Sequence, residues 1–219
     1  MHSHTFPASA CGEMSPEELV EELMIGGYSG CVITNHFING NTGINPALDW
    51  EDFVEVYAED YRFAAEVASD YDIDIIFGVE EHVGGGLEIL CYGFTPEILL
   101  EHPELSEGNY DVWHRVAQSC GALCVQAHPF RDRDYIEDPG ALPLGYIDGI
   151  EVYNAANTDT DNCLAAEFAA ENPSLILVSG ADAHFVSTVC IAGIETQRRI
   201  RTPEELVSVL KSGEYKLLQ

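Results

Sequence analysis

The chain has 219 residues, and 38 Asp and Glu against 9 Lys and Arg give it a formal net charge of −29. A surface this acidic repels phosphodiester backbones and anionic lipid headgroups, so we expect neither a long nucleic acid nor a membrane as a partner. Hydrophobic residues still make up 46% of the sequence, which is enough to form a core and excludes a disordered acidic tail.

The predicted elements alternate between short apolar strands and longer amphipathic helices. Ser15 followed by Pro16 and two acids is typical of a helix start, and this helix is predicted to end near Gly26. The other predicted elements are helices at 49–69, 110–119, 161–171 and 202–212 and strands at 31–34, 73–79, 87–92, 122–127, 149–153, 175–179 and 189–194. This alternation predicts a parallel, barrel-like α/β architecture.

Length and cysteine usage bound the organisation of the chain. At this length a single domain spanning residues 1–219 is the default for a barrel-like α/β protein. The seven cysteines are an odd count, and Cys31 and Cys124 lie inside apolar strand-like runs. This usage is typical of free thiols in a reducing compartment, so we expect a cytoplasmic protein. There is no apolar run of about 20 residues and no signal-like N-terminus.

Side chains that can bind metals follow the ends of the predicted strands and also open the chain. They are, in chain order, His2, His4, His36, Glu80, His128, Asp182 and His184. In α/β barrels the active site lies at the carboxyl ends of the strands, so these side chains are expected to converge. Imidazoles with carboxylates favour zinc, manganese or iron in a hydrolytic site over a structural site of four cysteines.

The same residues lie in motifs whose order resembles the polymerase and histidinol phosphatase (PHP) superfamily over essentially the whole chain. The motifs are His2-Ser3-His4-Thr5, Ile33-Thr34-Asn35-His36, Gly78-Val79-Glu80, Ala127-His128-Pro129, Ile150-Glu151-Val152-Tyr153-Asn154 and Ser179-Gly180-Ala181-Asp182-Ala183-His184. Each motif is weak alone, and together they are specific. The resemblance implies a distorted (β/α)7 barrel of PHP type with two or three divalent metal ions.

The resemblance also implies a distribution of ligands among the ions. His2, His4, Glu80 and Asp182 would hold the first ion, Glu80 would bridge to a second ion bound by His128, and His36 and His184 would hold a third. The sequence departs from the family pattern at Asn35, where Asp is common. It also departs at the third residue of the first motif, where Cys11 or Glu13 is the candidate ligand. Glu88 is a candidate to complete the second site.

Several other polar residues have two interpretations. Glu151 is either a ligand or supporting group of the site, or a salt-bridge residue at a strand end. His82 either faces the site or lies in a surface loop, whereas His102 and His114 are expected at the surface or in packing. Arg131, three residues after His128, is predicted to contact a substrate phosphate through its planar guanidinium. Its alternative is an ion pair with Asp132 or Asp134, and Arg133 is the weaker candidate.

These residues predict a metal-dependent phosphoesterase acting on a small phosphomonoester or nucleotide. Ions bridged by Glu80 and bound by His128 would activate a water as nucleophile, and Arg131 would neutralise charge on the phosphoryl oxygens. One alternative is amide or ester hydrolysis on the same barrel, and another is a non-catalytic metal-binding module that regulates a partner. The sequence leaves open the substrate, the metals, the leaving-group acid and the oligomeric state.

Overall fold

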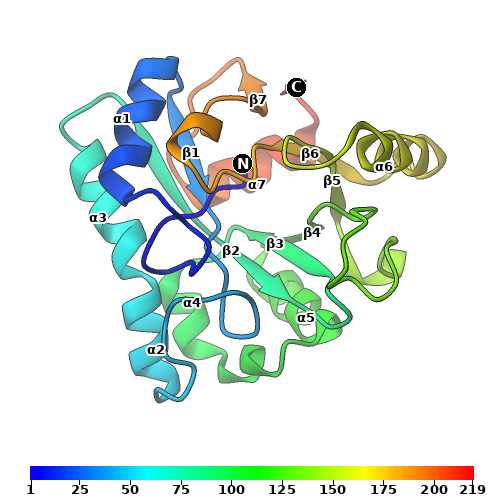
Figure 1. The fold of residues 1–219 in the computed structure, drawn as a ribbon, viewed down its shortest axis with the longest axis horizontal. Coiled ribbons are helices and arrows are strands. Elements are labelled where there is room, and N and C mark those ends of the chain that lie inside the picture. Colours follow the sequence, from blue (N-terminus) through cyan, green and yellow to red (C-terminus); the bar gives the residue numbers. More distant parts are fainter.

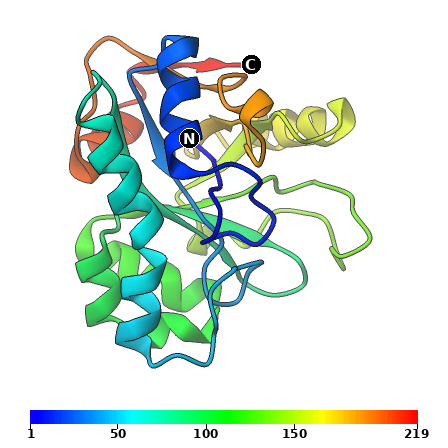
Figure 2. The ribbon, with the colours of Figure 1, turned by 60° about the vertical axis from the view of Figure 1, so that its left-hand side comes forward.

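The computed structural model describes residues 1–219 as seven helices, eight strands and three short 3₁₀ turns (Figures 1 and 2). The helices are α1 (Pro16–Gly26), α2 (Trp50–Tyr57), α3 (Glu59–Ala68), α4 (Pro96–Glu101), α5 (Tyr110–Cys120), α6 (Asp159–Glu171) and α7 (Pro203–Ser212). The strands are β1 (Gly30–Ile33), β2 (Asp74–His82), β3 (Glu88–Tyr92), β4 (Leu123–Gln126), β5 (Gly149–Asn154), β6 (Ile176–Gly180), β7 (Gly193–Thr196) and β8 (Tyr215–Leu218). The 3₁₀ turns are η1 (Pro103–Glu107), η2 (Leu144–Tyr146) and η3 (Val186–Thr188).

Six strands form one curled sheet in the order β1-β2-β3-β4-β5-β6, and β7 pairs with β8 in a separate two-stranded sheet. The expected α/β class is confirmed, but the strand order is not that of a regular (β/α)7 barrel. β3 runs antiparallel to both of its neighbours, because residues 83–87 turn the chain directly back from β2. Gly84, Gly85 and Gly86 all have positive φ in this turn, a conformation that glycine adopts without strain.

The N-terminal residues connect the two ends of the curled sheet. Ser3 forms a parallel bridge with Ala183, which lies just after β6, and its carbonyl accepts a hydrogen bond from the amide of Thr34, just after β1. The ribbon accordingly shows the N-terminus in the middle of the molecule (Figure 1). Residues 2–4 therefore occupy the position of a further strand without forming a regular ladder.

Local sequence signals account for most helix boundaries. The Ser15 hydroxyl accepts from the Glu18 amide, and the Glu18 carboxylate accepts from the Ser15 amide, which forms a capping box. The helix predicted at 49–69 is interrupted at Ala58, so it forms α2 and α3. The sequence analysis missed α4, the 3₁₀ turns and β8, and it placed β7 at 189–194.

The strand predicted at 73–79 is longer in the structure, because β2 runs to His82. Its first half pairs with β1, and from Gly78 onward it pairs with β3. Glu80 therefore lies within a paired strand, opposite Leu90, and not in a turn after the strand. On its other side Glu80 forms a parallel bridge with His36, so its backbone is held on both sides.

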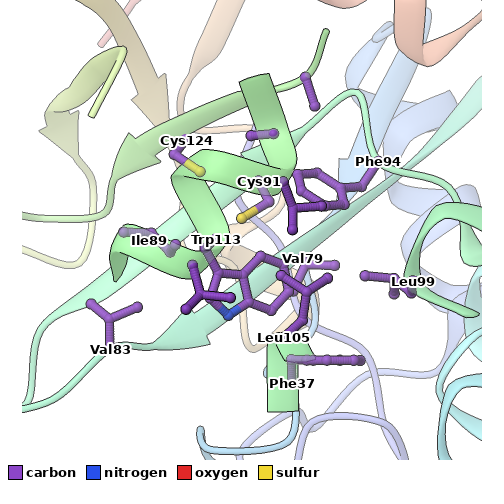
Figure 3. Close-up of a cluster of buried hydrophobic side chains, with 14 of the residues drawn as sticks. Phe37, Val79, Val83, Ile89, Cys91, Phe94, Leu99, Leu105, Trp113 and Cys124 are labelled. Carbon is purple, nitrogen blue, oxygen red and sulfur yellow. The ribbon is translucent and has the colours of Figure 1, made fainter. Parts of the chain in front are cut away.

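The largest apolar cluster lies around Trp113 of α5 and is called the Trp113 core here; its members include Phe37, Phe94, Leu105 and Cys91 (Figure 3). The Trp113 ring is fully buried and packs edge-on against Phe37, with ring centroids 5.7 Å apart. Phe37 directly follows His36, so the core supports the backbone of a candidate metal ligand. None of the helices combines the length and apolarity needed to cross a membrane.

Candidate metal centre

The Glu80 carboxylate lies at the centre of a buried group of histidines. Its Oε1 lies 3.0 Å from His2 Nε2 and 3.2 Å from His128 Nε2. Its Oε2 lies 3.0 Å from His36 Nδ1 and 3.3 Å from His4 Nε2. One carboxylate therefore contacts four imidazoles that come from three separate segments of the chain: the N-terminus, the strand end after β1 and the strand end after β4.

The remaining candidate ligands surround this centre. Asp182 Oδ1 is 3.4 Å from His2 Nε2 and 3.3 Å from His4 Nε2. Glu88 lies 3.5 Å from His36 and 3.4 Å from His128. Four triads have ligand atoms within 4.8 Å of one another: His2/His4/Glu80, His2/His128/Asp182, His36/Glu80/Glu88 and His4/His36/His184. The structure thus brings together eight of the nine residues predicted as ligands.

The donor set fits divalent ions. Nδ1 of His36 and Oε2 of Glu80 are both buried and make no hydrogen bond, although they are close to each other. A buried polar atom without a partner is costly, and metal coordination is one way to satisfy it. Imidazole nitrogens with carboxylate oxygens are the ligands that zinc, manganese and iron share.

The pKa values of His2 and His4, two histidines of the same motif, shift in opposite directions. Burial lowers the pKa of His2, but the carboxylates of Glu80 and Asp182 outweigh burial and raise this pKa well above its usual value. Burial and the adjacent His36 ring together lower the pKa of His4 to about 3. His4 is therefore neutral and ready to act as a ligand, whereas His2 holds a proton that a metal ion would have to displace.

The carboxylates also differ in charge state. Burial raises the pKa of Glu80, but His2 and other histidines outweigh burial and hold this pKa well below its usual range. Burial and the neighbouring Glu80 raise the pKa of Glu88 to about 7. Glu80 is therefore ionised at neutral pH, whereas Glu88 is the carboxylate whose ionisation a cation would favour.

Cys11 lines the same cavity as the ligands, whereas the side chain of Glu13 is exposed to solvent. Burial would raise the pKa of Cys11, but hydrogen bonds with His184 and His36 outweigh burial and lower it to about 6. Cys11 and Glu13 were the two candidates for the third ligand of the first motif, and their positions favour Cys11. It is not a member of the four triads.

Glu151 supports the ligands from behind. Its Oε1 lies 3.0 Å from His2 Nδ1, and its Oε2 accepts hydrogen bonds from the His128 amide at 3.0 Å and from Asn154 Nδ2 at 2.8 Å. A Cβ at Gly180 would lie 2.0 Å from Glu151 Oε1, so only glycine leaves room for this carboxylate. Glu151 thus contacts ligand residues without joining a triad.

Arg131 is buried and points at a candidate ligand, not at the acids next to it in sequence. Its Nη2 donates to Asp182 Oδ2 at 2.5 Å and to Asn154 Oδ1 at 3.0 Å, and its Nε donates to Asn157 Oδ1 at 2.7 Å. The alternative interpretation of Arg131, an ion pair with Asp132 or Asp134, therefore does not agree with the structure. Arg133 is more exposed and donates to the carbonyls of Asp132 and Ala156.

The other histidines lie outside the centre. His82 Nε2 accepts a hydrogen bond from the Gly86 amide in the β2–β3 turn, at 3.0 Å. His102 pairs with Glu104, and His114 contacts Gln118 and Asp148 on the outer side of α5. The surface interpretation of His82, rather than the site interpretation, therefore agrees with the structure.

Two ligand candidates carry the only positive φ angles among non-glycine residues, +29° at His128 and +50° at Asp182. Such backbone strain persists only when the surroundings impose it, and it concentrates at functional sites. Each residue lies two positions after the end of a strand, β4 or β6, and both line a cavity of about 390 Å³, together with Arg131, Tyr135 and Asn41. The sequence analysis missed Tyr135, Asn41, Asn157 and Ser9 because no motif marks them.

Comparisons with known proteins bear on this fold. Residues 159–215 match a family model described as PHP-associated. A two-domain protein from Bacteroides vulgatus ATCC 8482 that contains a PHP-like metal-dependent phosphoesterase superposes with a TM-score of 0.70 at 16% identity. The chain has the PHP fold. The predicted resemblance to the PHP superfamily is thereby confirmed. The match covers 99% of this chain and 62% of that protein, so this chain spans less than two thirds of its length.

Other solved structures that are similar to this chain are described as an amidohydrolase and as an endonuclease. An amidohydrolase from Chromobacterium violaceum, solved with sulfate and without metal, has a TM-score of 0.61 at 14% identity, over 100% of this chain and 96% of that one. The lesion-specific Endonuclease Q from Pyrococcus furiosus has a TM-score of 0.64 at 17% identity, and the match covers 99% of this chain and 56% of that one. No curated protein sequence matches the chain. These names agree with the hydrolase class expected from the motifs.

The exclusion of long nucleic acids was wrong. An Endonuclease Q complex with a 27-mer duplex that has an abasic lesion at its active site shares the PHP fold, with a TM-score of 0.61 at 15% identity over 99% of this chain and 57% of that one. The net charge of −29 sums the whole surface and does not report the potential at one site. A nucleic-acid substrate is therefore compatible with this fold.

Proposed function

We propose that this chain is a metal-dependent phosphoesterase whose centre is built around Glu80. The observation that carries the proposal is the convergence of eight ligand candidates, six of which line one cavity, with two buried atoms that have no hydrogen-bond partner. His2, His4, Glu80 and Asp182 would hold a first ion. His128 and Glu88 would hold a second ion with Glu80, and His36, His184 and Cys11 would hold a third.

Divalent ions bound there would lower the pKa of a water nucleophile and neutralise charge on a phosphoryl group. The chain supplies orientation and a further cation. Arg131 uses Nε and Nη2 to contact Asn157, Asn154 and Asp182, which leaves its Nη1 group for a phosphoryl oxygen. The Asp182 carboxylate outweighs the effect of burial and raises the pKa of Arg131, so the guanidinium stays charged.

The substrate that we favour is a small phosphomonoester or a nucleotide. A cavity of about 390 Å³ is in the range that small-molecule ligands occupy. The Chromobacterium violaceum protein was solved with bound sulfate, an oxyanion that resembles phosphate. Because Endonuclease Q shares this fold and binds a duplex with an abasic lesion, damaged DNA is a second phosphate ester to test.

The test is turnover by the full chain loaded separately with Zn²⁺, Mn²⁺ or Fe²⁺. The panel contains an aryl phosphomonoester, an aryl phosphodiester, nucleotides, an abasic-site duplex, and amide and carboxylic ester substrates. We expect phosphate ester hydrolysis, with His128→Ala reducing kcat/KM by about 100- to 1,000-fold, as for the loss of one group that stabilises charge in the transition state. His102→Ala is the matched control and should change nothing, because His102 lies at the surface.

Other outcomes decide between the alternatives. Turnover of amides or carboxylic esters alone would replace the phosphoesterase by the amide or ester hydrolase. If every metal form is inert on the whole panel and His128→Ala changes only the melting temperature, the chain is a metal-binding module.

A further inference from the structure

A chain of buried hydrogen bonds runs from α3 to the ring of His4. Asp60 Oδ2 accepts from the Thr5 hydroxyl at 2.9 Å, and Thr5 Oγ1 accepts from Asn35 Nδ2 at 2.9 Å. Asn35 Oδ1 accepts from the Ser9 hydroxyl at 2.9 Å, and Ser9 Oγ lies 3.1 Å from His4 Nδ1. All five side chains are buried. They are called the His4 hydrogen-bond chain below.

The backbone determines the direction of these hydrogen bonds. The Thr5 amide donates to Asn35 Oδ1 at 2.7 Å, and an amide N–H can only donate. This atom of Asn35 is therefore the oxygen, and its NH₂ group faces Thr5. Asn35 Oδ1 has no proton, so at 2.9 Å the Ser9 hydroxyl must direct its single proton toward it.

Ser9 Oγ consequently acts as an acceptor on its other side. It accepts the His36 amide at 2.9 Å, which leaves one lone pair for His4 Nδ1. A lone pair on Nδ1 would face that lone pair and repel it. His4 therefore donates its Nδ1–H to Ser9 Oγ. Its Nε2 lies 3.1 Å from His2 Nε2 and 3.3 Å from Glu80 Oε2 and Asp182 Oδ1, so its lone pair can accept from His2 in the metal-free protein and bind an ion in the loaded one.

We propose that Ser9, held by Asn35, is a positioning residue that fixes the Nδ1–H tautomer of His4 and presents Nε2 to the metal centre. The proposal rests on the metal centre of the proposed function. It also accounts for Asn35. An Asp at this position could not donate to Thr5 Oγ1, and it would place a second carboxylate next to the one Thr5 hydroxyl that Asp60 already uses.

The first test needs no metal, and it uses a variant only to assign the signal. In the metal-free protein with ¹⁵N-labelled histidine, long-range ¹H–¹⁵N spectra report which ring nitrogen carries the proton. We expect the Nδ1–H tautomer at His4, assigned by its loss in His4→Gln. An Nε2–H tautomer in the unsubstituted protein would overturn the proposal. This readout is independent of turnover, so an inert enzyme does not decide it.

The second test measures Zn²⁺ affinity by competition with a chelator. Loss of a residue that orients a ligand lowers metal affinity by about 10–100-fold, and we expect this for Ser9→Ala together with loss of the pure Nδ1–H tautomer. Thr42→Ala is the matched control. The Thr42 hydroxyl donates to the Ala8 carbonyl of the same loop but does not contact His4. An equal loss of affinity in Thr42→Ala would show that the loop, and not the tautomer, matters.

The third test moves a carboxylate from one position of the His4 hydrogen-bond chain to another. Asn35→Asp should weaken Zn²⁺ binding, because two carboxylates then compete for one Thr5 hydroxyl. Asp60→Asn in the same protein removes one of the two competing carboxylates, while its amide oxygen can still accept from the Ala8 amide, so the Thr5 hydroxyl can donate to the new Asp and most of the affinity should return. If the double variant binds Zn²⁺ no better than Asn35→Asp, the hydrogen-bond chain does not set the affinity and the proposal fails.

Discussion

The Trp113 core and the Glu80 centre are adjacent and largely buried, but they bury opposite kinds of atoms. Both contain polar atoms without a hydrogen-bond partner, Trp113 Nε1 in the core and His36 Nδ1 with Glu80 Oε2 in the centre. Around Trp113 Nε1 the neighbours are apolar, so this atom is an isolated cost within a well-packed cluster. Around Glu80 several lone-pair donors face one another. Convergence of donors, and not a single orphaned atom, therefore identifies the metal centre.

The two regions are linked by the His36–Phe37 peptide, which raises the question of whether they act independently. Phe37 packs edge-on against Trp50, Phe53 and Tyr57 as well as against Trp113. These further contacts should hold Phe37, and so the His36 backbone, when one neighbour is lost. Substitutions in each region test this separation.

The largest effect is expected from Trp113→Ala. Truncation of a fully buried aromatic side chain costs about 3–5 kcal/mol of unfolding free energy, because it loses apolar burial and leaves a cavity. Urea unfolding measures this cost. Zn²⁺ affinity of the folded variant should change by no more than about twofold if the regions are independent. A larger loss of affinity would show that Phe37 couples the core to His36.

Glu80→Gln should produce the opposite pattern. Groups that only orient a ligand contribute about 10–100-fold to metal affinity, so removing the charge of the central carboxylate should cost at least about 100-fold. Chelator competition measures the affinity, and near-ultraviolet circular dichroism checks that the metal-free fold is intact. A variant that loses its tertiary signal, with no change in affinity per folded molecule, would make Glu80 a structural residue.

The smallest effect concerns pH and depends on His2. The raised pKa of His2 means that a metal ion displaces a proton there, so Zn²⁺ affinity should rise about tenfold per pH unit and level off above the pKa of the folded state. Because folding raises the pKa of His2, protonated His2 stabilises the metal-free protein fully below about pH 6.5. This stabilisation is lost as the pH rises through the pKa that His2 has in the folded protein. Isothermal titration at several pH values measures the slope. A flat profile would exclude a proton-holding His2.

The sequence by itself determined the chemical types at the centre and the local starts of the helices. Hydrophobic periodicity and capping residues act over a few positions, so Ser15 and Glu18 form the predicted capping box. The motifs likewise placed imidazoles and carboxylates near strand ends in a recognisable order. Together the motifs resembled the PHP superfamily closely enough to imply its α/β fold, but not the antiparallel β3.

Tertiary structure decided the strand directions and the hydrogen-bond partners. β3 is antiparallel because the glycine turn returns the chain directly beside β2, and the N-terminal residues connect β1 to β6 only once both ends of the sheet are formed. Arg131 contacts Asp182, which lies 51 positions away, and not its sequence neighbours. Ser9 can orient His4 only because Asn35 is brought beside it. Such partners are separated by long stretches of chain, and no local pattern of residues records which of them will be adjacent after folding.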